Sequence, residues 1–115
     1  MPQTVRTFWG VRSGRTPLNV NWDAIESDSV VLITASLYVP PVSTPPPGES
    51  LQRVDNPNVA VRVENISPHG PPFDDNRGVT FVVTLERGLG FPAEGFLATD
   101  ITVLDDKPFE TQIDL

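Results

Sequence analysis

Residues 30–39 read VVLITASLYV, and this stretch decides the class of fold. Apolar and small polar residues alternate along it with a period of two, which is the period of a β-strand. Val31, Ile33 and Leu37 fall on the same face of such a strand. The first residues are apolar on both faces, as in a strand that has neighbours on both sides. We therefore expect a strand in the middle of a sheet.

Six further short runs show the same alternation. They are residues 5–12, 18–22, 59–64, 79–86, 97–104 and 109–113. Ser13 to Pro17, between the first two runs, is typical of a turn. The chain holds 13 prolines, which argue against helices because proline cannot continue one. Seven short strands predict an all-β fold: a single β-sandwich, immunoglobulin-like or jelly-roll-like, that covers residues 1–115.

In every strand that supplies the predicted core, the odd-numbered face is the more apolar one, so we expect it to point inward. The predicted core consists of Val31, Ile33, Leu37, Val61, Val63, Phe81, Val83, Leu85, Ile101 and Val103.

Residues 40–58 form a long proline-rich loop or arm within the domain. The segment is too long for a hairpin loop and too rich in proline for a strand. The run Pro45, Pro46 and Pro47 favours a stiff, extended conformation. Two interpretations stay open: an insertion without a role, or an arm that lies across a neighbouring subunit at a low ordering cost.

Charge is divided unevenly between the two halves of the chain. The net charge is −7. Residues 63–115 carry this entire net charge, because the positive and negative residues of 1–62 balance. The two halves could neutralise each other within one sheet, or a basic edge of one copy could meet an acidic edge of another. An acidic chain repels phosphate, so we expect no nucleic-acid partner. The candidate basic interface consists of Arg6, Arg12, Arg15, Arg53 and the neighbouring prolines 45–47.

The candidate ligand-binding residues fall into two groups. His69, the one histidine of the chain, could bind a ligand or simply hydrogen-bond a loop carbonyl. Asp74, Asp75 and Asn76 resemble part of a calcium loop. The glycine that follows comes one position too early for such a loop, and these residue types are also typical of tight turns, so we expect no metal site.

Trp22 follows Asn19 and Asn21, a combination of ring and amides that can bind a sugar. A tryptophan on an alternating apolar face is more often part of a core. A carbohydrate-binding, lectin-like module is therefore the alternative function, with a glycan as its partner.

The first function we expect is a non-catalytic structural or interaction module that forms a homo-oligomer or sits in a larger protein assembly. The chain has no cysteine, and we find no nucleophile elbow, so we expect neither an enzyme nor a cofactor. No secretory signal and no apolar run long enough to cross a bilayer is visible, which predicts a soluble chain made in the cytoplasm without membrane insertion.

Overall fold

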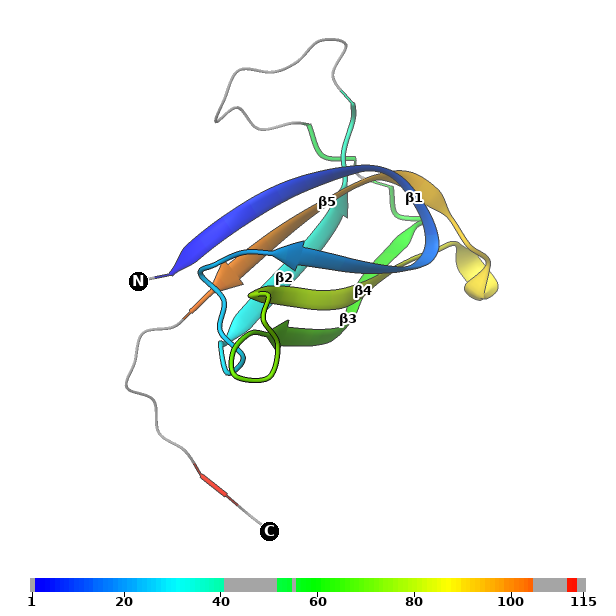
Figure 1. Cartoon of the computed structure of the whole chain (residues 1–115). Coiled ribbons are helices and arrows are strands. Elements are labelled where there is room, and N and C mark those ends of the chain that lie inside the picture. The colour runs from blue at the N-terminus through cyan, green and yellow to red at the C-terminus, as the bar shows by residue number, and fades with distance from the viewer. Residues whose placement is uncertain (1, 41–51, 55, 105–111, 114–115) are drawn as a thin grey trace.

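A computed structural model describes residues 2–40, 52–54, 56–104 and 112–113. Its described part is all-β, with five antiparallel strands and a single turn of 3-10 helix (Figure 1). The elements are β1 Gln3–Asn21, β2 Val31–Leu37, β3 Ala60–His69, β4 Gly78–Glu86, η1 Gly88–Gly90 and β5 Glu94–Val103. No helix in this part of the chain is long and apolar enough to cross a membrane.

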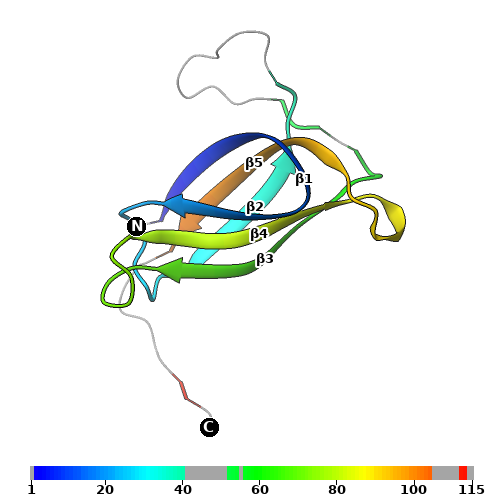
Figure 2. The ribbon, with the colours of Figure 1, turned by 45° about the vertical axis from the view of Figure 1, so that its right-hand side comes forward.

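The strands form one sheet in the order β2-β5-β1-β4-β3. β1 has 19 residues and changes partner along its length. Residues 3–13 pair with β5, and residues 14–21 pair with β4. The sheet therefore curls along β1 until its two outer strands, β2 and β3, lie against each other in a shape close to a barrel (Figures 1 and 2).

The predicted core is confirmed. Phe81, Val83, Leu85, Ile101 and Val103 are at most 3% exposed. Leu37 is also buried, and Val31, Ile33, Val61 and Val63 pack against the same cluster while they stay partly exposed. The core has further members that were not predicted, namely Leu18, Ile25, Val79, Ala93 and Leu97.

The prediction of seven strands in a sandwich is wrong for the described residues, which form five strands in one sheet. The expected turn at Ser13 to Pro17 is part of β1, so the first two runs are one strand. Gly14, within that run, has a φ of 61° and lies where β1 passes from β5 to β4, so turn-like residues mark a bend in one strand. A separate bulge lies between Phe8 and Gly10. An extra residue at a bulge changes which alternate residues face inward. The residues of β1 that face inward therefore have odd numbers before the bulge and even numbers, such as that of Leu18, after it.

Pro17 is tolerated inside this strand because the strand has one neighbour there. Pairing with β5 stops at Ser13, and Pro17 faces Val82 of β4. Successive backbone nitrogens of a strand point to opposite sides. Trp22 donates its backbone N–H to the backbone oxygen of Arg77, on the β4 side. Because Pro17 is an odd number of residues away from Trp22, its nitrogen points to the side that has no neighbouring strand. The missing N–H therefore costs no ladder hydrogen bond.

Two other expectations concern segments at the margins of the sheet. The proline-rich segment is described only at 40, 52–54 and 56–58, where Tyr38 and Arg53 form an antiparallel bridge. The proposed arm residues Pro45 to Pro47 lie outside the described residues. The expected strand 109–113 also falls outside them except for Gln112 and Ile113, which belong to no strand.

Candidate functional site

His69 joins three segments at one end of the sheet. It is the last residue of β3. Its Nδ1 lies 2.6 Å from the backbone oxygen of Asn76, and its Nε2 lies 2.7 Å from Oδ1 of Asn19. Nδ2 of Asn19 in turn donates to Oδ1 of Asn21 at 2.9 Å. The structure therefore brings four of the predicted ligand-binding residues together.

This cluster is satisfied by its own members. Both ring nitrogens of His69 face oxygen acceptors of the protein, so a ring that carries two protons donates to both and leaves neither nitrogen free for a metal or a ligand. Asp74 accepts the backbone N–H of Asn76 at 2.8 Å, which is the hydrogen bond of an Asx turn. Asp75 is exposed. Among the described residues no three carboxylate or histidine side chains gather into a group that could hold a metal ion.

Trp22 stands apart from the amides that precede it. It is half-buried and packs against the apolar core, as Val20 does. Asn19 and Asn21 point to the exposed face of the same strand. The ring and the amides therefore lie on opposite faces of the strand and cannot bind the same sugar.

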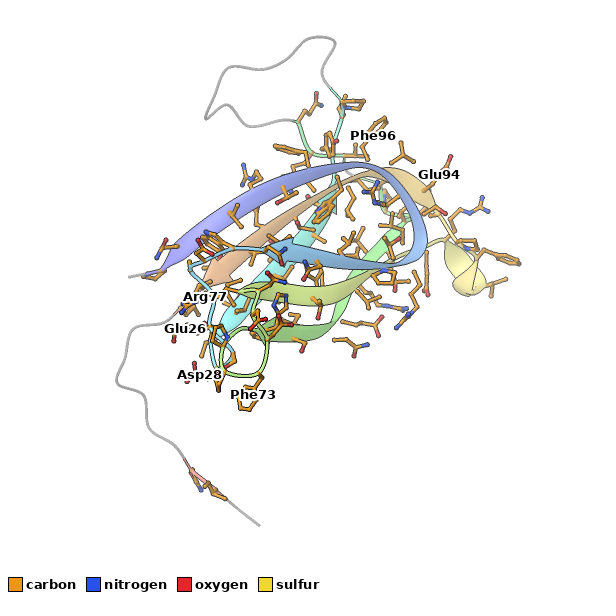
Figure 3. All side chains as sticks on the ribbon, viewed as in Figure 1. Glu26, Asp28, Phe73, Arg77, Glu94 and Phe96 are labelled. Atoms are coloured by element: carbon orange, nitrogen blue, oxygen red, sulfur yellow. The ribbon has the colours of Figure 1, made fainter. Side chains whose placement is uncertain are left out.

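The loop between β3 and β4 is tied to the segment after β1. Arg77 lies 3.8 Å from the carboxylate of Glu26, and the two side chains meet at one end of the molecule, while Phe73 projects from the loop nearby (Figure 3). Phe73 is 86% exposed.

A groove of about 470 Å³ runs over the outer face of β1, β3 and β4. Its floor is apolar, with Pro17 and Val82, and its rim carries the polar residues Asn19, Asn65 and Ser67. Asn65 has a φ of 55° and belongs to the irregularity between Glu64 and Ser67, where β3 bulges away from β4. The bulge lies beside the groove, and Asn19, a predicted ligand-binding residue, lies on its rim.

The expected interface residue Arg6 forms an ion pair within the chain. Its guanidinium nitrogens lie 2.7 and 3.1 Å from the two carboxylate oxygens of Asp100, its register partner on β5. Arg53 contacts the same carboxylate at 3.4 Å and also donates to Ser36. The hydrogen bond from Arg6 lowers the pKa of Asp100 below its usual value; burial opposes the shift and Arg53 adds to it. The opposite charges of the two halves thus neutralise each other at this point.

We predict that Asp100→Asn lowers the free energy of unfolding by about 1 kcal/mol at pH 7, because it leaves two arginines beside a neutral amide. Since the pKa of Asp100 is lowered in the folded state, its contribution is fully present above the unfolded pKa and is lost as the pH falls through the folded one. Urea unfolding at pH 7 and at a series of lower pH values checks this, since the difference between the two proteins should shrink as the pH falls. Asp75→Asn, which removes the same charge from an exposed loop, is the control. A difference that persists in acid would contradict the role of the ion pair.

The remaining interface candidates are Arg12 and Arg15. The guanidinium carbon of Arg12 lies 5.9 Å from the ring centre of Trp9, in cation–π geometry, and Arg12 also donates to the backbone oxygen of Val11. Arg15 is exposed and forms no ion pair with another described residue. Arg15 is therefore the predicted basic residue that the fold leaves available to a partner.

The two outer strands differ in how well their edges are protected. β3 carries Arg62, Glu64 and Pro68 and has a bulge, and charges, prolines and bulges all discourage pairing with another strand. β2 has none of these, since residues 30–39 contain no charge, no proline and no register shift. Its outer face exposes Val30 by 51% and Leu32 by 54%. β2 is thus an apolar edge strand whose last residues pair with residues 52–54 and whose remaining edge carries none of these features.

The core is also least well covered where these two strands meet. The inward side chains of β4 and β5 are buried, but those along β2 and β3, apart from Leu37, stay partly exposed. We call this boundary the seam. Its partly exposed inward residues are Val31, Ile33, Ala35, Val59, Val61 and Val63.

Sequence reasoning missed the seam, although its signal was visible. The apolar character of residues 30–33 on both faces predicted a central strand, but the structure places β2 at the end of the sheet. The apolar pattern is typical of a strand with a neighbour on each side. In the described part of the chain, β2 pairs with one strand, β5, along most of its length.

Comparisons of the chain with protein-family models, with curated proteins and with solved structures find no match.

Proposed function

We propose that this chain is a non-catalytic interaction module that associates with copies of itself. The observation that supports the proposal best is the edge of β2 along residues 31–35, which carries no charge, no proline and no bulge. A strand edge presents backbone donors and acceptors, and natural proteins usually block such an edge unless it has a partner. The partly exposed core of the seam adds apolar surface that association would bury.

Attraction between opposite charges contributes less to the proposed association than the charge distribution of the sequence predicts. Arg6 and Arg53 are engaged with Asp100, which leaves Arg15 to attract an acidic neighbour. Backbone and apolar contacts are then the main source of affinity, and long-range attraction mainly speeds the encounter.

Sedimentation velocity tests the proposal. We expect the protein to sediment as an oligomer at tens of micromolar, and the oligomer to persist at about 0.5 M salt, where the Debye length is roughly 4 Å. A monomer at every concentration would refute the proposal. An oligomer that dissociates in salt would show that charge pairing holds the copies together, against the proposed edge contact.

A carbohydrate-binding module is the second candidate, and the outer groove favours it. The groove has an apolar floor and a rim of amide and hydroxyl groups, which is a combination that can hold a small neutral ligand. Trp22 takes no part in it, and Asn19 is held by His69. Binding on a glycan array that Asn65→Ala abolishes would favour this candidate.

A further inference from the structure

We propose that the loop between β4 and β5 of one copy of this chain docks, through Leu89 and Phe91, in the outer groove of a second copy. We call residues 87–92 the tip loop, and the outer groove is the hollow over β1, β3 and β4. This contact uses other surfaces than the edge of β2, so it goes beyond the proposed function by adding a second interface. The contact is heterologous, because two unlike surfaces meet.

The tip loop carries the most exposed large apolar side chain of the described residues. Leu89 is 97% exposed, and Phe91 is 57% exposed. η1, which lies within this loop, stands beyond the strands at one side of the molecule (Figures 1 and 2). The gain from the hydrophobic effect is proportional to the apolar surface removed from water. The fold of a single copy therefore gains almost nothing from the side chain of Leu89.

The backbone at Leu89 is unfavourable for a leucine. Its φ is 64° and its ψ is 24°, in the left-handed region where a Cβ atom crowds the backbone. Glycine adopts this region readily, and the chain has glycine on both sides of this position, at Gly88 and Gly90. Residues held in strained conformations are concentrated at sites that bind partners and ligands. A strained leucine that is almost fully exposed is therefore a candidate for contact with a partner.

The outer groove has the size and the polarity that such a side chain needs. Its volume is about 470 Å³, which lies within the range of pockets that hold small organic molecules. Its floor is apolar, and its rim carries the uncharged side chains of Asn19, Asn65 and Ser67. An apolar side chain can enter such a hollow without removing water from an ion.

Charge favours the approach of the tip loop to the groove. Arg87, the first residue of the tip loop, forms no ion pair with another described residue. Glu64 borders the groove as the register partner of Val82 in its floor. Arg62 contacts both Glu64 and Glu86, so this group of three side chains keeps one net negative charge. A tip loop with a positive charge therefore meets a groove with an acidic border.

The tip that fills a groove must come from another copy. Leu89 is almost fully exposed, so it does not fill the groove of its own copy. The tip loop begins after Glu86, the last residue of β4, whereas Val82 in the groove floor lies four residues earlier. This separation is about 13 Å along the strand. Each copy therefore keeps a free tip loop or a free groove until the succession of contacts closes into a ring.

The test uses two variants of the full chain. Leu89→Gly removes the apolar tip, and Ser67→Arg places a long charged side chain in the groove. Both positions are exposed, so neither change disturbs the core. We expect each variant alone to associate about tenfold more weakly than the parent in sedimentation, as the loss of one buried apolar side chain predicts. Ile113→Gly and Thr4→Arg, which make comparable changes at exposed positions elsewhere, should associate like the parent.

A mixture of the two variants tests whether the tip loop and the groove are partners. Leu89→Gly keeps an intact groove, and Ser67→Arg keeps an intact tip loop, so the mixture can form the contact that neither variant forms alone. We expect the mixture to form one-to-one pairs with the affinity of the parent contact. Urea unfolding of Leu89→Gly should give a midpoint no lower than that of the parent, because glycine relieves the strained φ.

The outcomes separate this inference from the proposed function. A parent that associates as strongly as both variants would overturn the docking of the tip loop and leave self-association through the edge of β2 standing. If Leu89→Gly alone weakened association and the mixture did not restore it, the tip would dock outside the groove, and the inference would be wrong. A parent that is monomeric at every concentration would overturn both proposals. Glycan binding by such a monomer, abolished in Ser67→Arg, would assign the groove to the carbohydrate candidate.

Discussion

Phe81→Ala is expected to lower the free energy of unfolding by about 3–5 kcal/mol. The side chain is 1% exposed and lies in the middle of β4, the strand that joins β1 to β3. Its ring meets that of Trp9 edge to face, with 6.5 Å between the ring centres. Truncation would therefore remove apolar contacts from several strands at once and leave a cavity that the curled sheet cannot easily fill.

Urea unfolding measures this loss, and Phe73→Ala is the control. Phe73 is 86% exposed in the loop before β4, so the same change there should alter the free energy of unfolding by less than about 0.5 kcal/mol. A domain of this size has about 5–15 kcal/mol of stability, so Phe81→Ala would be partly unfolded if the parent lies near the lower limit. Equal transition midpoints for Phe81→Ala and the parent would mean that the described inward face of β4 is wrong.

The face that each strand turns inward could be predicted from the sequence, because alternation is a local property. Val83 and Ile101 lie in long, regular strands, and their odd residue numbers were enough to predict that they face inward. The prediction failed in β1, where the expected turn at Ser13 to Pro17, with Gly14 at a φ of 61°, is a bend within one strand. Glycine with positive φ is equally typical of a turn, so the sequence could not distinguish a bent strand from two strands.

The contacts between distant segments could not be predicted in the same way. His69 meets Asn19, fifty positions away, only because β4 lies between their two strands. The pairing of Arg6 with Asp100 likewise depends on the register of β1 and β5. Residue type indicated that these side chains were polar and available, but their partners follow from strand order, which depends on long-range pairing.

Gly78→Ala is expected to have the second largest effect, about 2–3 kcal/mol. A Cβ atom at this position would lie 2.2 Å from the backbone oxygen of Val20 and 2.8 Å from Cα of Asn21. It would also lie 3.0 Å from Cε1 of His69. Two of these three atoms belong to the backbone of β1, which cannot rotate away as a side chain can. The first residue of β4 would have to move away from both of its neighbouring strands.

Gly88→Ala is the matched control, because a Cβ there meets no atom within 4 Å. We expect urea unfolding to show a large loss for Gly78→Ala and a change within about 0.5 kcal/mol for Gly88→Ala. The amide resonances of Asn19 and Asn76 should shift in Gly78→Ala alone, because the displaced strand disturbs the hydrogen bonds of His69 to both residues. If both variants were as stable as the parent, the close approach of β4 to β1 at this end of the sheet would be wrong. The satisfied His69 cluster that depends on it would then lose its geometric basis, and His69 would again be a candidate for ligand binding.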